Sequence, residues 1–108
     1  MATIIIPVRN DLPAYKFKID LEGVMYVLDF GFNDRSKIWY MSILDQSEKL
    51  VIGDLPILVN VPLTDQYVKK GLPPGRFIAI DETGKKQNPK IDNFGSDVKL
   101  FYQESDDV

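Results

Sequence analysis

The sequence predicts a mostly β fold, a small antiparallel barrel or sandwich of about six or seven short strands with at most one short helix. Apolar and polar residues alternate with a period of two along several segments, and turn-forming residues separate these segments at intervals of about ten residues. The chain has 108 residues, 44% of them hydrophobic, which suits one domain with a packed core.

Three parts are expected along the chain: an extended N-terminal arm over residues 1–14, a single β domain over residues 15–103 and an acidic C-terminal tail over residues 104–108. Pro7 and Pro13 turn the arm away from helix, because proline lacks a backbone donor and restricts the residue before it. The tail is short and acidic, and chain ends of this kind fray.

The arm carries three consecutive isoleucines, Ile4, Ile5 and Ile6, which favour a strand. Two alternatives follow for this strand. Either it closes the sheet of its own domain, or it adds to a sheet edge of a neighbouring subunit. In the second case main-chain hydrogen bonds supply affinity and alternate isoleucines fill pockets on the partner.

The clearest element of the sequence is a hairpin. Residues 15–21 alternate apolar with charged side chains, as expected of a half-buried strand. Residues 24–32 place Val24, Tyr26, Leu28, Phe30 and Phe32 on one face. Glu22 and Gly23 between them form a short turn, in which Gly23 is free to take a positive φ. The two segments therefore predict an antiparallel pair.

The next strand, residues 38–44, has apolar residues on both faces, which predicts a central strand covered on both sides. Trp39 is expected in the core, because its large ring buries much apolar area, and Tyr40 points the other way toward a second packing surface. Polar turns connect this strand to the hairpin and to a further strand over residues 50–52, which completes a meander.

The second half of the chain is less regular. Prolines interrupt it, and Thr64 caps at most one helical turn that ends near Gly71. Residues 76–81 and 98–103 are the last two predicted strands. The residues expected to be mostly buried are Phe17, Ile19, Tyr26, Leu28, Phe30, Trp39, Ile43 and Leu100.

The composition excludes several classes of site. The chain has no His and no Cys, which removes His-based serine triads, cysteine nucleophiles and nearly every zinc site. Its 13 basic and 16 acidic residues give a net charge of −3, which disfavours nonspecific nucleic-acid binding. Two basic doublets, Lys69-Lys70 and Lys85-Lys86, are expected in solvated loops. No segment approaches the roughly 20 apolar residues of a membrane span.

Carboxylates are the remaining candidates for catalysis or metal binding. A glycosidase-type pair would come from four residues, Glu22, Asp29, Asp45 and Asp81. Most of them lie at turns, where acidic residues favour solvent and local hydrogen bonds. Asp92, Asn93 and Asp97 offer oxygen ligands without the spacing of a calcium loop. We therefore predict no catalytic residue, no cofactor, no metal site and no enzymatic activity.

Several short motifs follow one another in a characteristic order. After the aromatic hairpin they are Phe32-Asn33, Trp39-Tyr40-Met41-Ser42-Ile43, Gly53 with Leu55-Pro56-Ile57-Leu58, Pro74-Gly75-Arg76-Phe77, Phe94-Gly95 and Val98-Lys99-Leu100-Phe101-Tyr102. Over residues 15–102 this order resembles the small baseplate plug family of contractile-tailed bacteriophages. The sequence departs from the family at Gln46-Ser47-Glu48, where the family has a glycine-rich turn, and the resemblance leaves the N-terminal arm unexplained.

The resemblance implies a structural subunit near the centre of the virion tail baseplate, in contact with hub, tube or spike proteins and without catalytic residues. We expect multiple copies in a symmetric assembly that forms in the host cytoplasm, with no nucleic-acid specificity and no membrane insertion. The expected partner-binding residues are Ile4, Ile5, Ile6 and Tyr40. The alternative is a carbohydrate- or ligand-binding β module, in which Trp39, Tyr40 or Tyr26 forms an exposed stacking platform.

Overall fold

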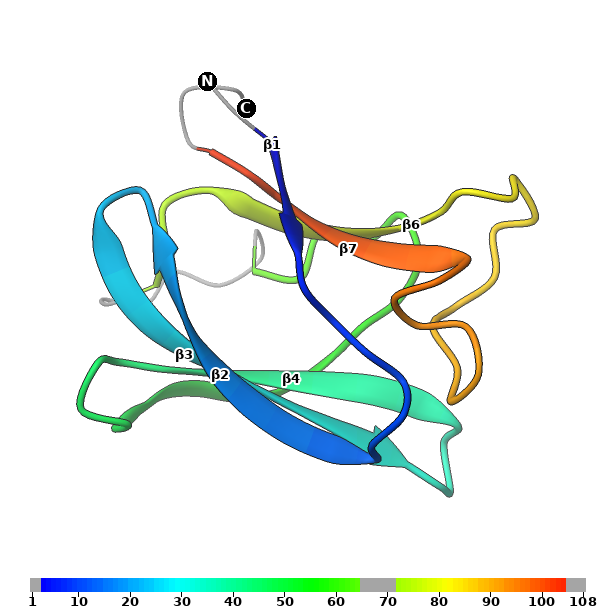
Figure 1. The fold of residues 1–108 in the computed structure, drawn as a ribbon, viewed down its shortest axis with the longest axis horizontal. Coiled ribbons are helices and arrows are strands. Elements are labelled where there is room, and N and C mark those ends of the chain that lie inside the picture. The colour runs from blue at the N-terminus through cyan, green and yellow to red at the C-terminus, as the bar shows by residue number, and fades with distance from the viewer. Residues whose placement is uncertain (1–2, 65–71, 105–108) are drawn as a thin grey trace.

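The computed structural model describes residues 3–64 and 72–104, and the regular structure of this part is entirely β-strand. The strands are β1 (Thr3–Ile6), β2 (Ala14–Leu21), β3 (Val24–Asn33), β4 (Ile38–Leu44), β5 (Leu50–Pro56), β6 (Arg76–Asp81) and β7 (Val98–Gln103). They form a three-stranded sheet in the order β1-β7-β6 and a four-stranded sheet in the order β2-β3-β4-β5. Figure 1 shows the two sheets as two layers, so the fold is a sandwich, one of the two predicted architectures.

The predicted hairpin is confirmed as β2 and β3. The two strands pair along their whole length, from Ala14 opposite Gly31 to Leu21 opposite Val24. Glu22 and Gly23 have φ values of 55° and 86°, the signs that a tight hairpin turn of the type I′ class requires. The Asp20 carboxylate accepts the Gly23 N–H at 2.9 Å and fixes this turn.

The meander β2-β3-β4-β5 is also confirmed, and short polar side chains hold its turns. Asn33 accepts the backbone N–H groups of Arg35 and Ser36, and Asp45 accepts those of Ser47 and Lys49. These contacts replace main-chain bonds that the chain gives up when it reverses. The polar segments between strands therefore set where each strand ends.

Strand β5 runs to Pro56, beyond the predicted end at residue 52. Its pairing with β4 shifts register, Asp54 has a φ of 56°, and the Asp54 N–H donates to the Ser42 hydroxyl instead of a backbone carbonyl. An irregular strand of this kind still pairs, but its local twist and bend increase. The predicted strand ended too early because Gly53 and Pro56 are residues that usually interrupt a strand.

The core lies between the two sheets. Tyr26, Leu28, Phe30, Trp39, Ile43 and Leu100 are buried as predicted, together with further residues of β6, β7 and the adjacent loops. Phe17 and Ile19 were expected in the same core but are only half-buried, packed against its margin. Both lie on β2, an edge strand of eight residues, whereas β1 at the same side of the other sheet has only four. The shorter strand cannot cover the whole of the longer one.

The outer face of β4 corrects a second expectation. Trp39, Met41 and Ile43 are completely buried on the inner face, but the alternate residues are only partly covered. The prediction of a strand covered on both sides is therefore wrong for the described part of the chain. The strand is central in its sheet, and its outer face carries apolar side chains that nothing within this part covers fully.

The sandwich has two unlike sides. At the sealed side, defined by β5, β6 and residues 57–63, the connecting chain bonds to both sheets: Ile57 N–H donates to the Trp39 carbonyl, and Leu63 N–H to the Phe77 carbonyl. At the open side, defined by β1 and β2, the chain descends directly from one layer to the other, as Figure 1 shows, and β1 and β2 belong to different sheets. The predicted helical turn after Thr64 lies outside the described residues, although Thr64 itself is buried.

Candidate partner-binding surface

Strand β1 pairs antiparallel with β7 of the same chain, from Thr3 opposite Gln103 to Ile6 opposite Leu100. The three isoleucines therefore alternate between two surroundings. Ile6 is buried in the core, and Ile4 is half-buried on the same inward face. Ile5 points outward and is 56% exposed. Of the two alternatives for the arm, the structure has the one in which it closes its own sheet, and only one of the three side chains is largely free.

Ile5 belongs to an apolar row across the outer face of the three-stranded sheet. It lies opposite Phe101, and Phe101 lies opposite Ile78, so one residue of each strand contributes. Ile80 on β6 extends the row and is 38% exposed. This row was not predicted. The signal was present, because apolar residues occupy both parities of residues 76–81, which indicates a strand with two apolar faces.

Tyr40 lies on the outer face of the other sheet, beside a hollow of about 440 Å³ lined by Gly31, Phe32, Asn33, Tyr40 and Asp54. Tyr40 is opposite Gly31 on β3 and Pro56 on β5. Since Gly31 has no side chain and nothing approaches the position of a Cβ within 4 Å, the sheet backbone forms the floor. Tyr40 is half-buried, and its hydroxyl donates to the Ser36 hydroxyl at 3.4 Å.

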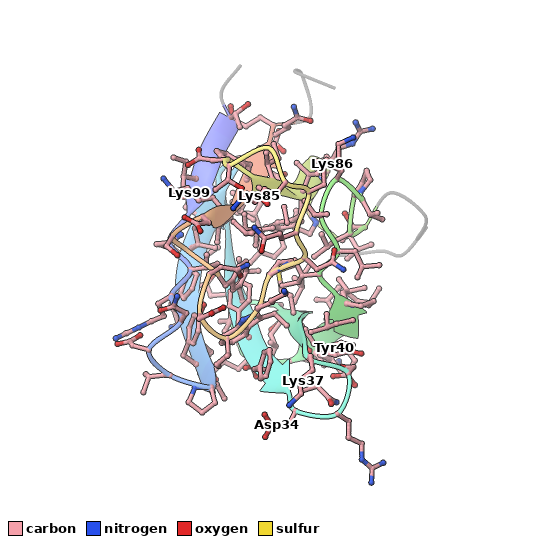
Figure 2. All side chains as sticks on the ribbon, turned by 90° about the vertical axis from the view of Figure 1, so that its right-hand side faces the viewer. Asp34, Lys37, Tyr40, Lys85, Lys86 and Lys99 are labelled. Carbon is pink, nitrogen blue, oxygen red and sulfur yellow. The ribbon has the colours of Figure 1, made fainter. Side chains whose placement is uncertain are left out.

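The four residues predicted to bind partners therefore do not form one site. Ile4, Ile5 and Ile6 lie on the three-stranded sheet, whereas Tyr40 lies on the outer face of the four-stranded sheet, near Lys37 and Asp34 in Figure 2. Their role in partner binding stays a prediction. The structure offers two separate surfaces.

The segment between β1 and β2 is tied down by Tyr15. Its hydroxyl accepts the Arg9 N–H at 2.8 Å and donates to the Arg9 carbonyl at 3.0 Å. Burial raises the pKa of the Tyr15 phenol above its ordinary value. Arg9 also pairs with Asp11, whose pKa this hydrogen bond lowers, but both side chains are in solvent. These hydrogen bonds fix the segment between the two sheets close to the start of β2.

Tyr102 links the two sheets at the tip of the β2–β3 hairpin. Its hydroxyl donates to the Glu22 carboxylate and accepts the Gly75 N–H at 2.8 Å. Burial, followed by the neighbouring carboxylate, raises the pKa of Tyr102 well above its ordinary value. A Cβ at position 75 would lie 2.2 Å from the Gln103 carbonyl oxygen, so only glycine allows this approach.

Three of the four candidate catalytic carboxylates, Glu22, Asp45 and Asp81, make hydrogen bonds that hold the fold. Asp45 accepts backbone amides in its turn, and the buried Asp81 accepts the Thr83 N–H and hydroxyl and the Gln87 N–H. These donors, the Thr83 hydroxyl first, lower the pKa of Asp81. Glu22 is held by Tyr102, and Asp29 is exposed in the middle of β3. Each carboxylate therefore lies in a different local setting, and the hydrogen bonds described here form no acid–base pair.

The three candidate calcium ligands differ in their surroundings. The Asn93 carboxamide is buried and holds its own loop by accepting the Lys90 N–H at 2.5 Å. Asp92 and Asp97 are exposed on either side. Over residues 3–64 and 72–104, no cluster of three metal-ligating side chains occurs. In the same residues, no helix has the length and apolar character that crossing a membrane needs.

The described basic doublet lies in the loop that follows β6. Figure 2 shows Lys85 and Lys86 at the level of the three-stranded sheet, with Lys99 nearby in the same layer and Tyr40 in the other. Lys99 is paired with Glu82 at 3.1 Å. The second doublet, Lys69-Lys70, lies outside the described residues. An ion pair beside an exposed doublet is typical of a solvated surface and does not form a phosphate site.

One known protein family matches most of the chain. A sequence model of the family described as cyanophage baseplate Pam3 plug gp18 matches residues 3–105. The chain belongs to this baseplate plug family. The match begins at Thr3 and extends past Gln103, so it includes all seven strands and the β1 segment that the resemblance in the sequence left unexplained. Among curated proteins, no sequence matches the chain.

Proposed function

We propose that this baseplate plug protein is a structural subunit at the centre of the phage tail baseplate, where it contacts hub, tube or spike proteins in several symmetry-related copies. The observation that supports this most strongly is the family match over the whole sandwich. A plug works by shape and contact, which needs a rigid scaffold and adhesive surfaces instead of reactive groups. Assembly would take place in the host cytoplasm, before the tail is complete.

The scaffold has the properties that this role requires. The turns are held by side-chain hydrogen bonds, and Trp39, with no exposed surface, packs against Phe94 with ring centroids 5.3 Å apart. Its indole N–H also donates to the Lys90 carbonyl at 2.8 Å and ties the long β6–β7 loop to the core. Contacts of this kind fix the outer surfaces relative to one another.

The outer surfaces carry apolar side chains whose exposure to water is unfavourable in a free monomer. Within residues 3–64 and 72–104, the large hydrophobic residues that are exposed are Ile5, Leu12, Val24, Leu50, Val61, Ile80 and Ile91. Single exposed residues are ordinary, but Ile5 and Ile80 join the half-buried Phe101 and Ile78 in a contiguous row. A protein that functions inside an assembly buries such a row against its neighbours.

The carbohydrate-binding alternative needs Trp39, Tyr40 or Tyr26 to form an exposed stacking platform. Trp39 and Tyr26 are 0% and 6% exposed, which leaves Tyr40 alone of the three candidates. Tyr40 is itself half-buried, which disfavours it as a stacking platform. We therefore keep the Tyr40 hollow as a second contact surface for protein and not as a ligand site.

The test is to delete the gene from its phage and supply the protein in trans. We expect tails that lack the protein to be defective at the baseplate end, and gold-labelled antibody against a functional tagged copy to mark that end in electron micrographs. Purified infectious tails without the protein, or label along the tail tube or on the capsid, would contradict the proposal. A catalytic role would instead appear as tails that assemble normally but fail after attachment.

A further inference from the structure

The four edges of the two sheets differ in how well they are protected against a further strand. An exposed edge presents unpaired N–H and C=O groups, and proteins block it with charge, bulges, proline or a covering segment. On β2, the exposed Lys16 and Lys18 supply charge, and Lys16 is held by Glu48 at 2.6 Å. On β5, the register shifts and Pro56 interrupt the ladder.

The edge of β6 is covered from outside. Val59 forms an isolated bridge with Ala79, and the Asn60 N–H donates to the Ala79 carbonyl at 2.8 Å. Residues 57–63 thus occupy the position that an added strand would take. Three edges are therefore blocked, each by a different device.

Strand β1 has none of these devices in the described part of the chain. Thr3–Ile6 contains no charged residue, proline or bulge, and among the described strands it pairs only with β7. Its remaining backbone contact outside that pair is local, from the Val8 N–H to the Ile6 carbonyl at 2.7 Å. β1 is short, which limits the hazard of aggregation but leaves its edge chemically open.

Apolar side chains lie on both faces of the sheet beside this edge. On the outer face Ile5 begins the row that continues through Phe101. On the inner face Ile4 is only half-buried, as are Phe17 and Ile19 of β2 across the open side. A strand placed beside β1 would therefore contact apolar groups with both sets of its alternating side chains.

We propose that the free edge of β1 takes an extended, uncharged segment of another baseplate protein as an added strand, with apolar side chains on both of its faces. The main-chain groups of β1 would supply affinity, and the half-buried residues of the open side would accept the inward side chains. This inference rests on the proposed function, because it names the surface through which the plug contacts a neighbour.

A second copy of this chain is a poorer occupant. Pairing β1 with its own counterpart joins two strands of only four residues each. Two such short strands bury far less surface than the roughly 1,200–2,000 Å² of a standard stable interface. This pairing would also leave Phe17 and Ile19 uncovered, because β1 offers them only its own edge. A longer segment from another subunit satisfies the edge and the open side together.

The first experiment uses the full-length protein supplied to a phage that lacks it, as Ile5→Lys, Ile5→Thr and Leu50→Lys. Ile5 and Leu50 are 56% and 60% exposed, each on an edge strand, so the two lysines are matched in solvation. We expect all three variants to melt close to wild type. Ile5→Lys should enter tails about tenfold less often, since an edge lysine opposes strand addition, while Ile5→Thr and Leu50→Lys should enter normally.

The second experiment separates strand addition from a side-chain contact. Amide hydrogen exchange is compared between the free wild-type protein and the protein in purified tails, with β5 as the internal reference. We expect β1 amides to exchange more slowly in tails while β5 is unchanged. Unchanged exchange in β1, normal entry of Ile5→Lys, or a β1-dependent dimer of the free protein would each overturn the proposal. Absence of the wild-type protein from tails would instead refute the proposed function.

Discussion

The two sides of this sandwich differ, although both join the same pair of sheets. At the sealed side, residues 57–63 donate backbone hydrogen bonds into β6, and Ile57 donates into β4. At the open side, β1 and β2 remain in separate sheets, and inward-facing residues such as Phe17 and Ile19 are only half-buried. The first arrangement completes the fold within one chain, and the second leaves apolar side chains only partly covered.

If the β1 edge binds a partner as proposed, one small domain combines a packed core with an edge that can accept a neighbour's strand. A chain of about 100 residues buries only about two-thirds of its unfolded surface, so it has little stability to spare. On this proposal, the better-packed side would stabilise the domain before assembly, and the partly covered side would offer apolar contacts to a partner.

The largest effect is expected in the interior that both sides share. Trp39→Ala removes a completely buried ring that contacts Phe94, Phe32 and Tyr15 and donates to the Lys90 carbonyl. Such a truncation costs about 3–5 kcal/mol, against a total stability of about 5–15 kcal/mol for a domain. We expect no soluble folded protein, and a smaller loss for Trp39→Phe. A melting temperature equal to wild type would show that Trp39 is not part of the core.

The two sides are compared directly by the same chemical change. Ile57→Ala at the sealed side removes a completely buried side chain and should lower the free energy of unfolding by about 2–4 kcal/mol. Ile19→Ala at the open side removes a half-buried one and should cost about 1 kcal/mol, in proportion to the area lost. Urea denaturation of both variants provides the measurement. Equal losses would mean that the open side is as well packed as the sealed side.

The link between the hairpin tip and the three-stranded sheet is tested by Tyr102→Phe. The change leaves the ring in place but deprives the buried Gly75 N–H of its acceptor and the Glu22 carboxylate of a donor. An unpartnered buried group costs about 1–3 kcal/mol, and we expect a loss of stability in that range. Tyr40→Phe is the matched control, because its hydroxyl donates to the hydroxyl of the exposed Ser36, and it should melt as wild type does.

The smallest effect is a pH dependence in the β6–β7 loop. Hydrogen bonds from Thr83 and Gln87 lower the pKa of Asp81 in the folded protein. Its contribution to stability is therefore complete above the unfolded pKa of about 3.9 and is lost as the pH falls through the lower folded value. Asp81→Asn should narrow the difference in melting temperature between pH 7 and pH 3. If the melting temperature of both proteins changed equally between pH 7 and pH 3, Asp81 would not contribute to the pH dependence of stability.

Local patterns in the sequence were sufficient to predict the hairpin and the meander. The alternation over residues 15–32 determines which side chains of β2 and β3 face inward, and Gly23 adopts the positive φ that the turn requires. The burial of Trp39 followed from its size and its place in a strand. These features depend on residues close together in the chain, where periodicity is informative.

The remainder depends on contacts between distant residues. Nothing in the segment around Ile5 shows that it will pair with β7, almost the whole length of the chain away, so its partner stayed open between two alternatives. The half-burial of Phe17 and Ile19 follows from the short length of β1, a property of the opposite sheet. The row from Ile5 to Ile78 was not predicted for the same reason, because its residues come together only when three distant strands pair.

The most direct test of this account is a cryo-electron microscopy reconstruction of the intact baseplate at a resolution that separates strands. We expect a continuous sheet in which a segment of another protein runs beside β1, with its side chains over Ile5 on one face and toward Phe17 and Ile19 on the other. At the sealed side, residues 57–63 should still cover the edge of β6, with no added strand there. A β1 edge that faces solvent while β5 or β6 gains the added strand would contradict the account.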